Sequence, residues 1–125
     1  MSSGNDLTTE AIRLALGMNQ LRAEYASQNI SRANTPGAQA TRADFGATQA
    51  LLRQAAAADG ASETGLMSSL MTAPAPSLRS DPLGASIQLD EEVADMSSAS
   101  LNYQALSESL GRHFGLMRLA VTGKN

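Results

Sequence analysis

A chain of 125 residues has room for at most one domain. Only 3% of its residues are aromatic and it has neither Trp nor Cys, which argues against a wide globular core and excludes a disulfide framework and a thiolate metal site. The net charge of −3 is spread without a basic stripe, so we expect no binding to nucleic acid and no polybasic membrane patch.

The hydropathy of the sequence indicates whether to expect a signal peptide or a membrane span. Residues 1–6 are polar, and no run approaches the roughly 18 apolar residues of a membrane span. We therefore expect no cleavable signal peptide and no direct membrane span. Such a chain would be cytosolic, or exported by a route that reads no such signal.

The N-terminal segment, residues 1–34, is predicted to hold one amphipathic helix that begins near Leu7. Its apolar residues recur at alternating spacings of four and three, which is typical of a coiled-coil seam. Asp6 or Thr8 would cap the start of this helix. Gly17 within it is interpreted as a point of close approach to a neighbouring helix. The seam residues that we expect to contact other subunits are Leu14, Met18, Leu21, Tyr25 and, after a shift of register, Ile30.

A turn motif follows, formed by Asn29, Asn34, Thr35, Pro36 and Gly37. Pro36 disfavours the α region at Thr35, so the helix should end there. Gly37 supplies the unusual φ that a turn needs. The side chains of Asn29 and Asn34 can bond to nearby backbone and help to end the helix.

Residues 35–89 are predicted to be this turn and a flexible segment rich in Ala, Ser, Gly and Pro. Asp44 could cap a short helix over residues 45–58. Residues 59–86 bury too little apolar area to offset their ordering entropy, so we expect them to be disordered in free solution. Within them, residues 66–71 could form a helical turn against another surface.

The C-terminal segment, residues 90–122, is predicted to be a second amphipathic helix. Asp90 is its candidate N-cap, and acidic residues near its start and basic residues near its end complement the helix dipole. An apolar column recurs every seven residues along this segment. Its seam residues are Val93, Met96, Tyr103, Leu110, Phe114 and Met117.

Two helices with seams predict an all-α fold, in which the terminal helices pair as an antiparallel coiled-coil hairpin with a long, weakly structured middle segment. An isolated pair of helices is marginal in water, and both seams would bury more area if many copies packed side by side. We therefore expect self-assembly. For the isolated chain we expect modest helicity and poorly cooperative unfolding.

Both ends of the chain resemble the flagellar axial proteins. Residues 28–37, Gln-Asn-Ile-Ser-Arg-Ala-Asn-Thr-Pro-Gly, are similar to the N-terminal signature of those proteins, and residues 89–96 with 100–106 are similar to the C-terminal one. The short length, the Leu-Asp-x-Glu entry to the last helix and the lack of an inserted β-domain most resemble the FlgB family of basal-body rod proteins. Ser31, Arg32 and Ala38 depart from the usual pattern, so the aromatic contact common after the turn is not carried over.

The resemblance implies a structural role without catalysis, cofactor or small-molecule substrate. Proteins of this family are exported by the flagellar type III apparatus and assemble in the periplasm as the proximal rod, which transmits torque for motility. The implied partners are further copies of the chain, other flagellar rod proteins, the rod-base adaptor, and the membrane ring with its export gate.

Three other interpretations compete with this one. Catalysis would use His113 as a base with Asp95 or a serine, but the serines lie in a Ser-rich background without a nucleophile turn. Asp90, Glu91, Glu92 and Asp95 could suggest a cation site, but their clustering suits the helix dipole and the ordered loop of a calcium site is missing. The third reading is a sibling rod subunit, or an inner-rod subunit or coiled-coil adaptor of a type III secretion machine. A generic adaptor or inner-rod subunit should lack the Asn-Thr-Pro-Gly turn.

Overall fold

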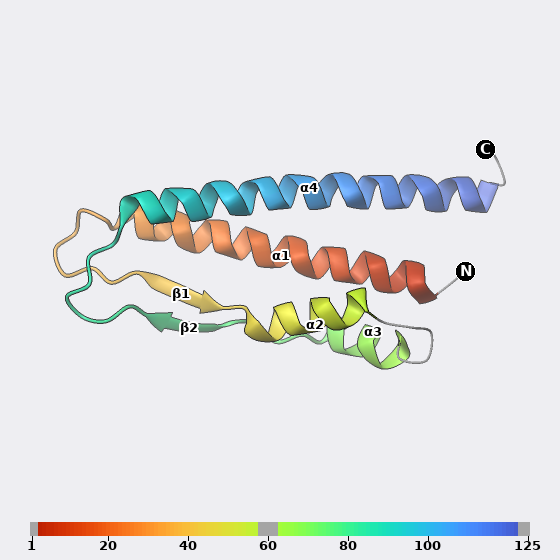
Figure 1. The fold of residues 1–125 in the computed structure, drawn as a ribbon, viewed down its shortest axis with the longest axis horizontal. Coiled ribbons are helices and arrows are strands. Elements are labelled where there is room, and N and C mark those ends of the chain that lie inside the picture. The colour runs from red at the N-terminus through yellow and green to blue at the C-terminus, as the bar shows by residue number, and fades with distance from the viewer. Residues whose placement is uncertain (1–2, 58–62, 123–125) are drawn as a thin grey trace.

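The computed structural model describes residues 3–57 and 63–122. The elements follow one another as α1 (Ser3–Ser31), β1 (Thr41–Asp44), α2 (Gly46–Ala56), α3 (Glu63–Met71), β2 (Ser77–Ser80) and α4 (Leu89–Thr122). The fold is mostly helical, and the long terminal helices α1 and α4 pack together, as predicted (Figure 1). None of the described helices is long and apolar enough to cross a membrane.

The helices α1 and α4 run antiparallel (Figure 1). Asn29 of α1 donates a hydrogen bond to Glu92 of α4, and Asn102 of α4 contacts Asn19 of α1 at 3.5 Å. Between these two contacts the chain advances by ten residues in opposite directions along the two helices. The first helix begins at Ser3, earlier than the expected Leu7.

The turn after α1 has the geometry that its sequence predicts. The amide of Ala38 donates to the carbonyl of Thr35 at 3.2 Å, which places Pro36 and Gly37 at the two central positions of a β-turn. Gly37 has a φ of 78°, and a positive φ at the third position of a turn after Pro is the type II pattern. The chain therefore leaves α1 and reverses towards β1.

The middle segment is more ordered than the sequence predicts, and the all-α prediction is wrong in this part. Strands β1 and β2 pair antiparallel, with Thr41 opposite Ser80 and Asp44 opposite Ser77. Helix α2 lies within the predicted range 45–58, and α3 and β2 lie in the region expected to be disordered. The prediction rests on the burial of apolar area alone, whereas an ion pair between Arg42 and Asp81 also links the two strands.

The core is thin and consists mainly of small residues. One side of α1 faces α4, and another side faces α2 and α3 (Figure 1). The buried apolar residues are Leu7, Ala26, Ala40, Leu70 and Ala99. Because four polar residues (Asn19, Asn29, Thr48 and Glu92) are also buried, hydrogen bonds and ion pairs must contribute to the packing.

Candidate functional site

Four polar residues meet where α1 ends, α4 begins and the two-stranded sheet of β1 and β2 lies beside them (Figure 1). We call Asn29, Arg42, Asp81 and Glu92 the junction cluster. Asn29 and Glu92 are the largest fully buried side chains described, with 1% and 0% of their surface exposed. Each comes from a different element of the fold or from the loop beside it, so the cluster joins the helices to the middle segment.

Asn29 satisfies both ends of its amide within this cluster. Its Oδ1 accepts a hydrogen bond from the backbone amide of Thr41 at 2.8 Å and another from Arg32 Nη2 at 3.1 Å. Its Nδ2 donates to Glu92 Oε1 at 2.6 Å and to the Thr41 carbonyl at 3.1 Å. Asn29 thus fixes the start of β1 on the end of α1, in addition to binding α4.

Arg42 joins the two carboxylates of the cluster. Its Nη1 lies 2.8 Å from Glu92 Oε2, and its Nη2 lies 3.1 Å from Asp81 Oδ2. The hydrogen bond to Asp81, followed by the contacts with Glu92, raises the pKa of the Arg42 guanidinium against the opposing effect of burial. The guanidinium therefore stays charged over the whole range in which proteins fold.

Asp81 binds the two strands to each other beyond their own pairing. Its backbone amide donates to the carbonyl of Ala40 at 2.9 Å, and its carbonyl accepts from Gln39 Nε2 at 2.6 Å. Arg79 Nη1 lies 3.5 Å from its carboxylate. Since both carboxylates of the cluster are engaged by guanidinium groups, the arrangement suits a mechanical joint better than proton transfer.

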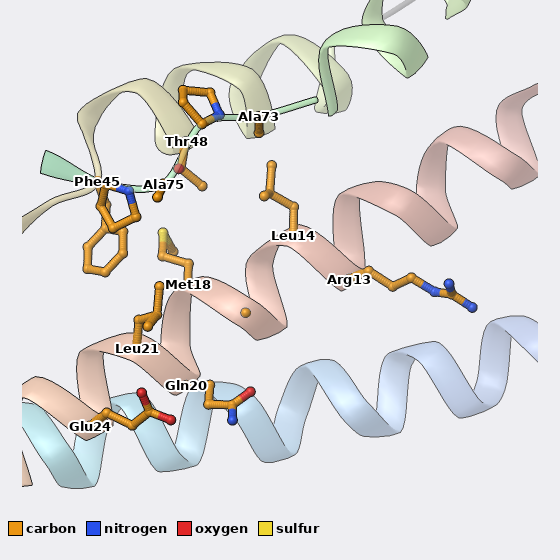
Figure 2. A pocket seen from close by; sticks show the side chains of 13 residues that line it. Arg13, Leu14, Met18, Gln20, Leu21, Glu24, Phe45, Thr48, Ala73 and Ala75 are labelled. Carbon is orange, nitrogen blue, oxygen red and sulfur yellow. The ribbon is translucent and has the colours of Figure 1, made fainter. Parts of the chain in front are cut away.

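The apolar stripe of α1 faces the middle segment in this chain. Figure 2 shows Leu14, Met18 and Leu21 directed towards Phe45, Thr48 and the strand-like stretch around Ala73 and Ala75. A cavity of about 420 Å³ remains between them. Gly17 also lines this cavity, and a Cβ there would meet nothing within 4 Å beyond its own helix, so among residues 3–57 and 63–122 no helix approaches it closely.

Several large apolar side chains of α4 are exposed, some on the side away from α1 and some, such as Tyr103, beside it. On the side facing α1, Glu92 and Ala99 are buried and Leu106 is half-buried. Leu101 and Leu116 are 65% and 66% exposed. The exposed large apolar residues of α4 are Leu89, Val93, Leu101, Tyr103, Phe114, Leu116 and Leu119.

The predicted seam residues are divided among several environments. Tyr25 is half-buried beside Arg42, Phe45 and Glu92, and Ile30 is half-buried near the end of α1. Met96 and Tyr103 line a groove of about 540 Å³ between α1 and α4. Leu110 is half-buried, whereas Val93 and Phe114 are exposed. The side chain of Met117 lies outside the described part of the chain.

The turn motif is divided in the same way. Asn29 is buried in the junction cluster, whereas Asn34, Thr35, Pro36 and Gly37 are exposed. The exposed part borders a hollow of about 290 Å³, whose other wall is residues 84–87 before α4. One asparagine of the motif therefore holds the fold together, and the rest forms the outer end of the molecule.

Sequence reasoning missed two members of the cluster and misread a third. Arg42 and Asp81 are single charges in a segment of low apolar content, and no spacing in the sequence relates them. Glu92 was interpreted only as a partner of the helix dipole, yet it is buried against Asn29 and Arg42. Glu92 precedes Ala99 by seven residues, or two helical turns, so both lie on the side of α4 that faces α1. This spacing could have identified Glu92 as buried, unlike its neighbours Asp90 and Glu91.

The candidate catalytic base and the acidic residues of the candidate cation site lie far apart on α4. The ring of His113 lies 6.4 Å from that of Phe114, on the far part of α4 from the acidic residues at its start. Within the described ranges, no group of three or more His, Asp or Glu side chains could hold a metal ion.

Comparison with known proteins places this chain in no family. No family model, no curated protein and no solved structure matches it.

Proposed function

We propose that this chain is a structural subunit of the bacterial flagellar basal body, and that it assembles through its terminal helices into the proximal rod. The proposal combines the two signatures at the ends of the sequence with the shape of the fold. The observation that carries it is the exposure of large apolar side chains on α4, among them Leu101 and Leu116, which are 65% and 66% exposed. Such a surface is expected of a helix that packs against other subunits.

In this proposal the pair of α1 and α4 is a coiled-coil hairpin, and neighbouring copies cover the outer side of α4. Torque passes mechanically through interlocked helices, so neither catalysis nor a cofactor is required. The chain would reach the periplasm through the flagellar export apparatus without a cleaved signal. Its partners would be other copies, other rod proteins, the rod-base adaptor and the ring with its export gate.

The junction cluster fits this mechanical role. It ties the middle segment to the two helices by bonds from Asn29, Arg42 and Glu92. A subunit that transmits force needs such cross-links between elements, because a thin core of small residues resists shear poorly. The buried Asn29 gives one residue of the N-terminal signature a physical purpose in this role.

The first test is deletion of residues 30–37 in the bacterium that encodes the chain. We expect loss of swimming and of rods in purified basal bodies, with part of the helicity of the purified chain retained. Full motility of the deletion strain would contradict the proposal. The same deletion separates a rod subunit from a generic coiled-coil adaptor, which should work without this turn.

The second test places a charge on the outer surface of α4. Leu101→Asp should leave the melting temperature of the purified chain unchanged, because this side chain is 65% exposed, but should abolish swimming. Ser98→Asp, which adds the same charge at another exposed position of α4, is the matched control and should swim. Leu110 is a poorer choice, because it is half-buried and its replacement would also destabilise the chain itself.

A further inference from the structure

Helix α1 has one face that stays largely exposed. Five residues at alternating spacings of three and four share this face: Glu10, Arg13, Gly17, Gln20 and Glu24. Glu10 is half-buried and the other four are exposed. The face borders the cavity of about 420 Å³ beside Met18 and Leu21, so this cavity is a groove that opens to solvent along α1 (Figure 2). We call the face and the hollow beside it the α1 groove.

The side of α4 that points away from α1 carries a second stripe, which we call the outer stripe. Its members recur at spacings of four, three and four, and all are exposed: Leu101, Ala105, Glu108 and Arg112. Leu101 follows the buried Ala99 by two residues, which turns it to the opposite side of the helix. The charged members of the groove and of the stripe take part in no ion pair within the described part of the chain. Both surfaces therefore present charges that a second molecule can pair.

The charges of the two surfaces match when α4 of a second copy lies antiparallel to α1. Placing Glu108 opposite Arg13 forms one ion pair between the copies. Arg112 then lies beside Glu10, because offsets of four and three residues differ by only about 1.5 Å along a helix axis. A parallel alignment with the same first pair would place Arg112 beside Gly17 instead, so charge complementarity favours the antiparallel one.

The same alignment places Leu101 over the apolar part of the groove. It lies seven residues from the first ion pair, which is also the distance from Arg13 to Gln20 along α1. At that level the groove lies between Gly17 and Leu21. A Cβ at Gly17 would meet nothing within 4 Å beyond its own helix, so the backbones of two helices can approach closely there.

From this complementarity we infer that the α1 groove of each copy binds the outer stripe of α4 from the next copy. The inference rests on the proposed self-assembly and names the two surfaces that meet. Because these surfaces are different parts of the chain, each copy has one neighbour on α1 and another on α4. Such a heterologous contact produces a closed ring or an open filament rather than a closed pair.

The contact between copies has the register of the contact within the chain. Asn19 of α1 meets Asn102 of its own α4. Arg13 lies six residues before Asn19, and Glu108 lies six residues after Asn102, so the pair between copies has the same offset. Neighbouring copies therefore point in the same direction and lie side by side at one level, with α1 and α4 of successive copies alternating in one layer.

A two-fold contact between two outer stripes is the competing arrangement. It would also bring Glu108 opposite Arg112, but it would reverse the direction of the second copy and leave the α1 groove empty. Charge reversal separates the two arrangements, because only the groove contact involves Arg13.

The experiment is sedimentation velocity on the purified full chain over a concentration series in low-salt buffer, where charge pairs are least screened. Glu108→Arg and Arg13→Glu should each raise the concentration of half-association at least about tenfold, because like charges then face each other. A mixture of these two variants should associate as the unaltered chain does, since each restores the opposite charge to the other. Arg53→Glu, the same change at an exposed position of α2, is the matched control and should have no effect. All three residues are exposed, so circular dichroism should show unchanged melting temperatures.

Three outcomes would overturn the inference, and they differ in what else they overturn. If the two charge reversals associate like the unaltered chain, the groove contact is wrong and the proposed assembly stands. If Glu108→Arg is rescued by mixing with Arg112→Glu and Arg13→Glu has no effect, the copies meet through a two-fold contact of α4. If the unaltered chain and every variant stay monomeric at all concentrations, both the groove contact and self-assembly by this chain are wrong.

Discussion

The two terminal helices look alike in the sequence, but they have different surroundings in the fold. Helix α1 has α4 along one side and the middle segment along another, and its seam residues Leu14, Met18 and Leu21 are half-buried. Helix α4 is covered on one side only, and Leu101 and Leu116 on its other surface are largely exposed. A regular apolar seam therefore predicts a helix. Whether its side chains pack within the chain or are left exposed for another molecule depends on the elements that lie beside the helix.

The largest expected effect tests the buried hydrogen bond between Asn29 of α1 and Glu92 of α4. Asn29→Asp keeps the shape of the side chain but sets a second carboxylate against Glu92, where a donor now lies 2.6 Å from Oε1. We expect a loss of about 3 kcal/mol in the free energy of unfolding, because a buried donor is lost and two carboxylates face each other, although Arg32 and Arg42 offset part of the repulsion. Urea unfolding followed by circular dichroism measures it.

The control for this substitution is Asn34→Asp in the exposed part of the same motif. It should change stability by less than about 0.5 kcal/mol. The loss caused by Asn29→Asp should also shrink as the pH is lowered, because a proton shared by the two carboxyl groups removes one of the repelling charges. Equal effects of the two substitutions, or a loss independent of pH, would contradict the described role of Asn29.

The second prediction concerns the ion pair between Glu92 of α4 and Arg42 of β1. Glu92→Ala should cost about 2 kcal/mol, because it removes the buried acceptor of Asn29 and one partner of Arg42, although Asn29 still donates to the Thr41 carbonyl and Arg42 still pairs with Asp81. Glu91→Ala, at the exposed neighbouring position, should cost a few tenths of a kcal/mol by weakening the helix dipole interaction. If both variants unfold at the same urea concentration, Glu92 does not hold the two parts together.

These two predictions depend on contacts of Asn29 and Glu92 that could not be predicted from the sequence. The terminal helices could be predicted, because apolar spacing and Pro36 with Gly37 act locally, and the same holds for the turn after α1. Arg42, Asp81 and Glu92 could not be paired, because they lie 39 or more residues apart or in separate segments, and a single charge carries no periodic signal.

Helix α3 and strand β2 could not be predicted for the same reason. Burial of apolar area was the only stabilising effect considered, and by that measure residues 59–86 are too polar to fold. The ion pairs of Arg42 with Asp81 and Glu92 link the two strands to each other and to α4, and apolar area does not measure such contacts. The sequence could also not say which side of each helix would be covered, since both helices carry apolar residues on more than one side.

A third prediction tests the contrast between the helices directly. Leu14→Asp should destabilise the chain by about 1.5 kcal/mol, because this half-buried side chain lies against the middle segment and a charge there would be partly desolvated. Leu101→Asp should change stability by less than about 0.5 kcal/mol. Thermal unfolding of the two variants side by side measures the difference. Equal destabilisation would mean that α4 is covered in solution as fully as α1.

The smallest effect concerns two glycines inside the helices. Gly17 of α1 and Gly111 of α4 are both exposed, and a Cβ at either position would meet no other atom within 4 Å. Replacement by Ala should therefore stabilise each variant by about 0.5–1 kcal/mol through helix propensity alone. The argument matters most for Gly17, which borders the cavity under the middle segment. A different result is that Gly111→Ala raises the urea midpoint and Gly17→Ala lowers it. In that case the middle segment packs against α1 more closely than the cavity implies, and α1 is packed as closely on that side as on the side facing α4.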